Sequence, residues 1–188
     1  MKVPVGTKSL IFGAHQFVLH PLFVALAWRR LHGSLPRDPC IWVALVVHDW
    51  GYWGLGDMDG EEGQHHPLRG ANLMGRLFDR GQTDTCWEGD WWRFTGSHSR
   101  TFAAMWGLSH SPLMAADKLA AALYPRWLYA LLCWLSGEYI EYRDRWVAAG
   151  TYPGRADDGA WAYCGHLQRN WAWFKVPGAA AGRAYGGE

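Results

Sequence analysis

The segment PCIWVALVVHDWG, which begins at Pro39 and ends at Gly51, restricts the fold more than any other part of the chain. Both end residues are typical of helix boundaries. From residue 41 to residue 47 nothing is polar apart from one indole N–H. A helix this uniformly apolar is expected to be buried on all sides. The segment therefore predicts a core helix that ends in a polar pair, His48 and Asp49.

The rest of the chain is also predicted to be helical, because strand alternation and hairpin dipeptides are scarce. Ser111 and Pro112 are suited to the N-cap and first position of one helix. The glycine-rich, acidic residues 51–64 are predicted to form a loop. We therefore expect an all-α fold, with one domain over residues 1–176 and a flexible tail over 177–188. The other expected helices are residues 9–31 with a break near Pro21, 66–79, 85–105 with some interruption, 111–124, 125–150 with a bend, and 157–174.

Net charge and hydropathy limit which partners the protein is expected to bind and where in the cell it is expected to act. The net charge of +1 over 188 residues argues against binding to long nucleic acid, but a small phosphorylated ligand needs only a local positive pocket. The most apolar stretch, 119–140, is interrupted by Pro125 and Arg126, which favours a buried helix hairpin over a membrane span. With no signal peptide evident at the start, we expect a cytoplasmic protein without membrane contact.

Cysteine and tryptophan usage adds two expectations. No CxxC pair occurs, so free thiols in a reducing compartment are predicted. The 14 tryptophans are read as core residues, and the tryptophan-rich C-terminal helices leave a homo-oligomer interface open. The four cysteines are Cys40, Cys86, Cys133 and Cys164.

His48 and Asp49 need a partner at the end of an apolar helix, since an unpaired buried charge is costly. Imidazole and carboxylate ligands together suit divalent iron, manganese, cobalt, nickel or zinc. Four more segments place polar residues at helix ends or in apolar runs. They are H-P-L-F-V-A-L-A with His20, H-H-P-L-R-G-A-N-L with His66, G-S-H-S-R with His98 and Arg100, and S-P-L-M-A-A-D-K-L with Asp117 and Lys118.

Alternatives stand beside two of these histidines. His15 competes with His20, which is favoured by its place at a helix start and by the V-A-x-A that follows. His65 competes with His66, which is favoured by its spacing to Gly70. The remaining histidines are assigned lesser roles: His110 to a loop or to substrate contact, and His32 and His166 to the surface or to helix caps.

The order His, His-Asp, His, His, Asp resembles the HD superfamily of metal-dependent phosphohydrolases, over residues 20 to about 123. V-V-H-D-W-G-Y, H-P-L-R-G-A-N-L and A-A-D-K-L carry the resemblance, and the spacing is similar to that of the dinuclear branches. Gly51 and Tyr52 stand where the nucleotidase and alarmone-hydrolase branches usually have a glutamate. The resemblance implies an HD-type helical bundle with a C-terminal helical extension, holding one or two divalent metal ions. It implies that one ion is held by His20, His48, Asp49 and Asp117, and that Asp49 bridges to a second held by His66 and His98.

Catalytic roles follow from that resemblance. Asp49 would bridge the metals, and Lys118 and Arg100, followed by Arg69, would neutralise phosphoryl charge. The acids of the glycine-rich loop (Asp57, Asp59, Glu61 and Glu62) would act as general acid or gate, or would simply be solvated. Glu138 and Glu141 share one helix face, where they would form a carboxylate pair or, as we expect, face water beside Arg143 or Arg145. The rings of Trp50, Tyr52 and Trp53 would stack a nucleobase or pack over the metal-bearing helix.

The predicted function is hydrolysis of a phosphate ester or anhydride, with a nucleotide or another small metabolite as substrate. The alternative is a dinuclear iron oxygenase that cleaves a C–C or C–P bond with dioxygen, because relatives with that activity share the ligand pattern. A third interpretation is a non-catalytic binding module, which predicts no tightly held metal.

Overall fold

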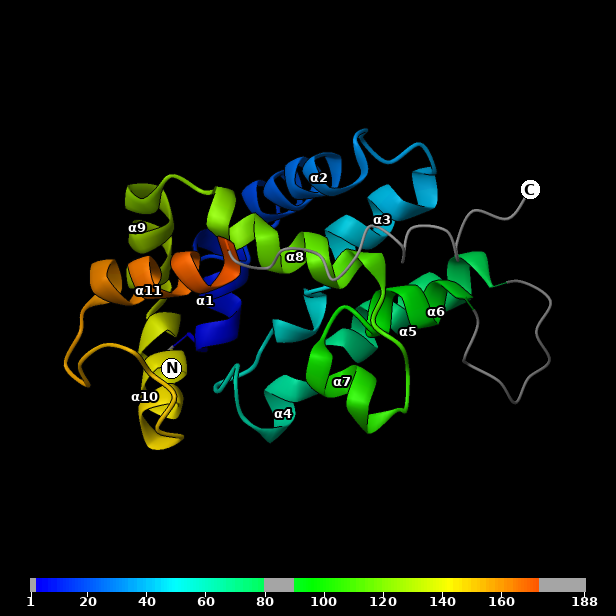
Figure 1. Ribbon diagram of the computed structural model, residues 1–188. Helices are drawn as coiled ribbons and strands as arrows, with labels where there is room; N and C mark the ends of the chain where they lie inside the picture. The colour runs from blue at the N-terminus through cyan, green and yellow to red at the C-terminus, as the bar shows by residue number, and fades with distance from the viewer. Residues whose placement is uncertain (1–2, 80–89, 173–188) are drawn as a thin grey trace.

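The computed structural model describes residues 3–79 and 90–172, and the predicted all-α fold is confirmed over these ranges, in which no strand occurs. The predicted tail and Cys86 lie outside the described residues. Figure 1 shows the arrangement of the helices. They are α1 (Val5–Phe12), α2 (Leu19–His32), α3 (Pro39–Val47), the 3-10 helix η1 (Trp50–Tyr52), α4 (Glu61–Gln64), α5 (Pro67–Phe78), α6 (Asp90–Gly96), α7 (Arg100–Met105), α8 (Pro112–Leu123), α9 (Arg126–Ser136), α10 (Glu138–Ala148) and α11 (Ala160–Ala172).

Helix α8 runs through the centre of the molecule and joins two groups of helices (Figure 1). On one side α2 packs along α8 and contacts α3, and α5 packs against α6. On the other side α9 and α11 pack against each other and against α1 and α10. The apolar core is divided in the same way. One cluster joins α2, α3 and α8, and a second, rich in tyrosine, lies among α9, α10 and α11.

Several boundaries differ from the predictions. The first helical region breaks between Phe12 and Leu19, so Pro21 lies in the first turn of α2, where the missing N–H costs nothing. The predicted loop contains η1 at its start and α4 at its end. The expected bend after α9 occurs at Gly137, whose φ of 81° is in the left-handed region. Ser111 is at the N-cap of α8, but its side chain makes no capping hydrogen bond.

Helix α3 begins where it was predicted to begin, because Asp38 accepts a hydrogen bond from the Cys40 N–H and Pro39 follows it. The prediction that α3 is buried on all sides is wrong. Trp42 is 39% exposed and Val46 is 40% exposed. The neighbouring α2 and α5 cover only part of the helix, so its apolar outer side faces outward.

The apolar stretch 119–140 forms the end of α8, a turn and α9. Trp127 and Trp134 on α9 are 62% and 61% exposed, so the prediction that this hairpin is buried is wrong for one face of α9. In the described part of the chain, no helix combines the length and the apolar character needed to cross a bilayer.

Candidate metal centre

The six side chains that the sequence singled out meet in the middle of the molecule, and all six are buried. Helix packing brings them together from distant parts of the chain, because α2 lies along α8 and α3 lies against α5. His20 lies in the first turn of α2, His48 and Asp49 follow α3, His66 lies between α4 and α5, His98 follows α6, and Asp117 lies within α8.

Four of these residues form a first group around the Nε2 atom of His20. This atom lies 3.2 Å from His48 Nε2, 3.1 Å from Asp49 Oδ2 and 3.2 Å from Asp117 Oδ1. His48 Nε2 lies 3.2 Å from Asp49 Oδ2. Each residue therefore directs one nitrogen or oxygen toward a common point.

Asp49, His66 and His98 form a second group. The Nε2 atoms of the two imidazoles lie 3.2 Å apart, and they lie 3.5 Å and 3.4 Å from Asp49 Oδ1. Asp49 thus directs Oδ2 to the first group and Oδ1 to the second. A shared carboxylate of this kind is what allows two cations to lie close together.

Three of the histidines are oriented by the same kind of hydrogen bond to the backbone. His48, His66 and His98 each lie just beyond the end of a helix and contact a backbone carbonyl three residues earlier through Nδ1. The Nδ1···O distances are 3.0, 2.7 and 2.6 Å. A carbonyl oxygen at a helix end has room for a further donor, and those of Gly63 and Thr95 accept the backbone N–H of His66 and His98 in addition to the imidazole. An imidazole that donates through Nδ1 presents a lone pair at Nε2, as metal ligands do.

The contact between His66 and His98 shows why this donor set suits a cation. Both rings use Nδ1 as a donor, so two Nε2 lone pairs face each other at 3.2 Å with a carboxylate oxygen beside them. Two ligand atoms bound at about 2.1 Å to one tetrahedral ion lie about 3.4 Å apart. The distances in both groups are close to this value, so the buried histidines and aspartates could hold one or more metal ions.

The ionisation of the cluster supports the same view. Burial raises the pKa of Asp49 and of Asp117, but His48 beside Asp49 and Lys118 beside Asp117 outweigh burial and hold both pKa values well below their usual range. Burial lowers the pKa of His48, but the two carboxylates raise it to about 10. Burial and the neighbouring His98 lower the pKa of His66 well below its usual range. A proton on His48 and the ammonium group of Lys118 can therefore balance the two carboxylates, whereas the imidazole of His66 stays neutral.

Two glycines explain why H-D-W-G and H-P-L-R-G occur together. A Cβ on Gly51 would lie 1.9 Å from the carbonyl oxygen of His66, and one on Gly70 would lie 2.5 Å from the carbonyl oxygen of Val47. Both positions therefore require the absence of a side chain, since real Cβ atoms do not approach this closely. The close approach holds the end of α3 against the start of α5, and it therefore holds the two donor groups together.

Tyr52 supports the second group in a way that the sequence did not predict. Its ring stacks on His66 with the centroids 4.0 Å apart and an angle of 14° between the planes. Tyr52 itself is buried against Leu10 and Met58. The H-D-W-G-Y segment thus supplies two candidate ligands, a close-packing glycine and a ring that stacks on a third candidate ligand.

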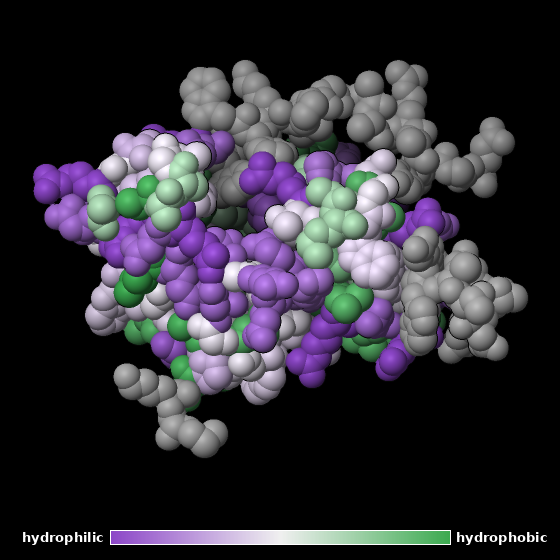
Figure 2. Space-filling model, turned by 90° about the horizontal axis from the view of Figure 1, so that it is seen from below, coloured by the Kyte–Doolittle hydropathy of each residue, from purple (hydrophilic) through white to green (hydrophobic). Residues whose placement is uncertain are grey.

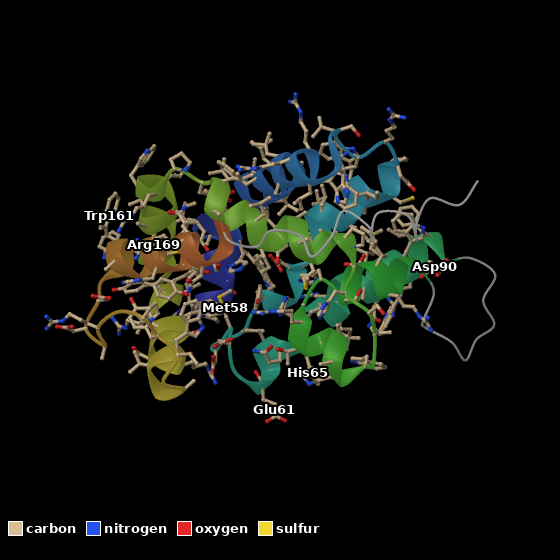
Figure 3. All side chains as sticks on the ribbon, in the orientation of Figure 1. Met58, Glu61, His65, Asp90, Trp161 and Arg169 are labelled. Atoms are coloured by element: carbon tan, nitrogen blue, oxygen red, sulfur yellow. The ribbon has the colours of Figure 1, made fainter. Side chains whose placement is uncertain are left out.

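The cluster borders a cavity of about 230 Å³. Lys118 and Arg100 line it together with His20, His66 and Asp117, so both predicted phosphate-binding cations are placed beside the candidate centre. Lys118 Nζ donates to Asp117 Oδ2 at 2.8 Å. Met58, which also lines the cavity, is labelled near the middle of the molecule in Figure 3.

The structure distinguishes the competing histidines. His20 belongs to the first group, whereas His15 Nδ1 lies 2.9 Å from Glu138. His66 belongs to the second group, whereas His65 is exposed and extends at the lower edge of the view in Figure 3. The remaining histidines lie away from the cluster: His32 packs on Trp28, His110 is exposed, and His166 lies near Asp158 and Arg169.

The acidic residues are divided between surface and interior. Glu61 and Glu62 are exposed, and Glu61 extends away from the molecule in Figure 3. Asp57 and Asp59 form ion pairs with Arg145. Figure 2 shows the molecule from below, and hydrophilic residues gather over the middle of that face. The expectation that Glu138 faces water is wrong. It is 1% exposed and bound to His15, because α10 packs against α1.

The aromatic residues after Asp49 have two different environments. Tyr52 packs inside, whereas Trp50 and Trp53 are 36% and 49% exposed and line a separate groove with Phe17, Arg69 and Arg76. Arg69 therefore does not lie beside the cluster, contrary to its predicted role.

The cysteines Cys40, Cys133 and Cys164 are free, in agreement with the prediction.

Comparison with models of known protein families, with curated proteins and with solved structures found no match to this chain. The arrangement of the cluster is compatible with an HD-like site. The functional argument therefore depends on the geometry and chemistry of the residues themselves.

Proposed function

We propose that this protein is a metal-dependent phosphohydrolase of the HD type, acting on a nucleotide or another small phosphate ester or anhydride. The observation that supports it most directly is the pair of donor groups sharing Asp49, placed at a cavity that also contains Lys118 and Arg100. Imidazole and carboxylate donors together suit iron, manganese, cobalt, nickel or zinc.

In this proposal the ligand roles are those that the resemblance implied. The first ion would be held by His20, His48, Asp49 and Asp117, and the second by Asp49, His66 and His98. Ions bound there would supply an acidified water and neutralise the charge of the phosphoryl group. The i−3 carbonyls would hold the imidazoles in the ligand tautomer, and Tyr52 would keep the ring of His66 in place.

Two cations of the chain would bind the substrate. Lys118 is fixed by its hydrogen bond to Asp117, so its ammonium group lies at the edge of the first group. Arg100 lines the same cavity from the first turn of α7. Together they would bind the phosphoryl oxygens, whose negative charge increases as the bond to the leaving group breaks.

The test combines elemental analysis with turnover. Purified protein should contain a divalent transition metal and, under argon with Mn²⁺, Co²⁺ or Ni²⁺, release phosphate or a nucleoside monophosphate from a panel of nucleotides. Lys118→Ala should lower kcat by about 10²–10³-fold and leave the metal content unchanged. Lys8→Ala, on α1 and outside the cavity, is the matched control.

Three results would contradict the proposal. Protein without bound metal would favour the binding module. Metal-loaded protein that releases no phosphate from any substrate would not be a hydrolase of this kind. Dioxygen consumption and a mixed-valence iron signal in place of hydrolysis would favour the oxygenase, which uses the same ligands.

A further inference from the structure

The cavity beside the metal centre extends well beyond the ligands. One end is formed by the ligand cluster with Lys118 and Arg100. The other end lies among α8, α9, α10 and α11, and half of the residues that line it are aromatic, so we call it the aromatic lobe. It is lined by Ala14, Ala121, Tyr129, Cys133, Tyr142, Trp146, Tyr163 and Leu167. A phosphate group bound at the metal end would not fill this lobe.

His15 lies between the two ends. Its ring centroid is 5.5 Å from that of His20 and 5.0 Å from that of Tyr52, which places it beside the metal end. Its Nδ1 lies 2.9 Å from Glu138 Oε2 and 2.9 Å from Ser9 Oγ. Since Nδ1 is occupied, Nε2 is the nitrogen of this ring that remains to bind a ligand in the cavity, which His15 lines.

Glu138 fixes that orientation. Its carboxylate is 1% exposed and accepts hydrogen bonds from Ser9 Oγ at 2.6 Å, from the Ala14 N–H at 2.7 Å and from Ser136 Oγ at 2.8 Å, in addition to its contact with His15. Burial of a carboxylate is costly unless it is bonded in this way. A buried acid that holds one nitrogen of an imidazole, and so directs the other, is a recurrent feature of substrate sites.

We propose that the substrate is a phosphorylated compound with a flat aromatic group, which occupies the aromatic lobe while His15 Nε2 hydrogen-bonds the phosphate-bearing end. The inference rests on the proposed function, because it uses the metal centre as the phosphate site. Tyrosine and tryptophan rings favour a flat aromatic guest, which they contact by stacking or edge-to-face packing. A purely aliphatic substrate would gain less from this lining.

The test compares two non-hydrolysable ligands that differ only in a phenyl ring, ethylphosphonate and 2-phenylethylphosphonate. Their Kd values are measured by calorimetry on Mn²⁺-loaded protein under argon. The phenyl compound should bind at least tenfold more tightly to the wild type. Ala121→Leu should remove this advantage by filling the lobe, whereas Ala122→Leu, one residue along α8 and outside the cavity, should retain it.

His15→Asn tests the second part. The Asn amide can replace Nδ1 toward Glu138 but has no group at the position of Nε2. The variant should bind both phosphonates about tenfold more weakly, with their ratio unchanged and the helical circular-dichroism spectrum retained. A residue with only a structural role would leave both affinities as they are, so wild-type affinities in this variant would exclude His15 from the substrate site.

Failure of this inference can be separated from failure of the proposed function. Equal affinity for the two phosphonates, or an unchanged ratio in Ala121→Leu, would exclude the aromatic lobe while leaving the phosphate site intact. If metal-loaded protein bound neither phosphonate, the phosphate site itself would be wrong, and both proposals would fail together.

Discussion

Replacement of the shared carboxylate is the sharpest test of the metal centre, because Asp49 is the one residue that belongs to both donor groups. Asp49→Asn preserves the shape of the side chain and removes its charge. The change reduces the first group from four ligands to three and the second from three to two. Asp117→Asn, by contrast, removes a ligand from the first group alone and leaves Asp49, His66 and His98 complete.

The magnitude follows from the number of complete groups. An ion present at a hundred times its Kd stabilises the folded state by about 2.7 kcal/mol. Two ions therefore contribute about 5 kcal/mol, which in a chain of this length raises the melting temperature by about 10 to 20 °C. The metal-induced increase should be about half as large in Asp117→Asn and close to zero in Asp49→Asn.

The assay is thermal unfolding of metal-free and metal-loaded protein, with the bound metal counted by elemental analysis. We expect two ions per chain in the wild type, about one in Asp117→Asn and fewer than one in Asp49→Asn. The metal-free proteins should remain helical, because neither change removes apolar contacts. If Asp49→Asn bound as many ions as the wild type, with the same thermal stabilisation, the shared-carboxylate geometry would be refuted.

Gly51→Ala should lower the free energy of unfolding by about 1–3 kcal/mol or more, because the new Cβ would lie 1.9 Å from the His66 carbonyl oxygen. Gly56→Ala should not lower it, because open space surrounds Gly56. Equal urea midpoints for the two variants would contradict the close packing at Gly51. Burial lowers the pKa of His15, but Glu138 outweighs it and raises that pKa, while the pKa of Glu138 is lowered by its hydrogen bonds despite burial. The stabilisation from this pair is therefore fully present between the unfolded pKa values of 4.5 and 6.5, and it is lost as the pH rises through the folded pKa of His15 or falls through that of Glu138. A double-mutant cycle of His15→Ala and Glu138→Gln should give a coupling of about 1–3 kcal/mol at pH 6 and a smaller one at pH 9, so equal couplings would exclude an ion pair.

The residues of the candidate metal centre could be singled out from the sequence because each is a polar residue in a place where helix physics disfavours it. His48 and Asp49 end an apolar helix, and Asp117 interrupts another. Such residues need buried partners, and the pattern indicates that they are partners of one another. Distances could not be predicted, because they depend on how α2 lies along α8 and how closely Gly51 allows α3 to approach α5.

The roles of His15 and Glu138 could not be predicted for a related reason. The helix start and the V-A-x-A sequence favoured His20 for the cluster, but nothing local gives His15 a partner. That partner is Glu138, which is 123 residues away from His15 and lies in the polar segment GEYIEYRDR. A segment with the pattern of a solvated helix face thus contains a carboxylate that is buried against Ser9 of α1, Ala14, His15 and Ser136 of α9.

The helix ends explain why a centre of this kind can be built from helices alone. Each of His48, His66 and His98 directs its Nδ1 to the backbone carbonyl three residues earlier, at the end of the preceding helix. This hydrogen bond to the helix end also directs Nε2 inward. The three imidazole rings are therefore held in a fixed orientation without a bound ion. Because a preorganised ligand loses little conformational entropy when it binds, this arrangement favours metal affinity without requiring a longer or more acidic loop.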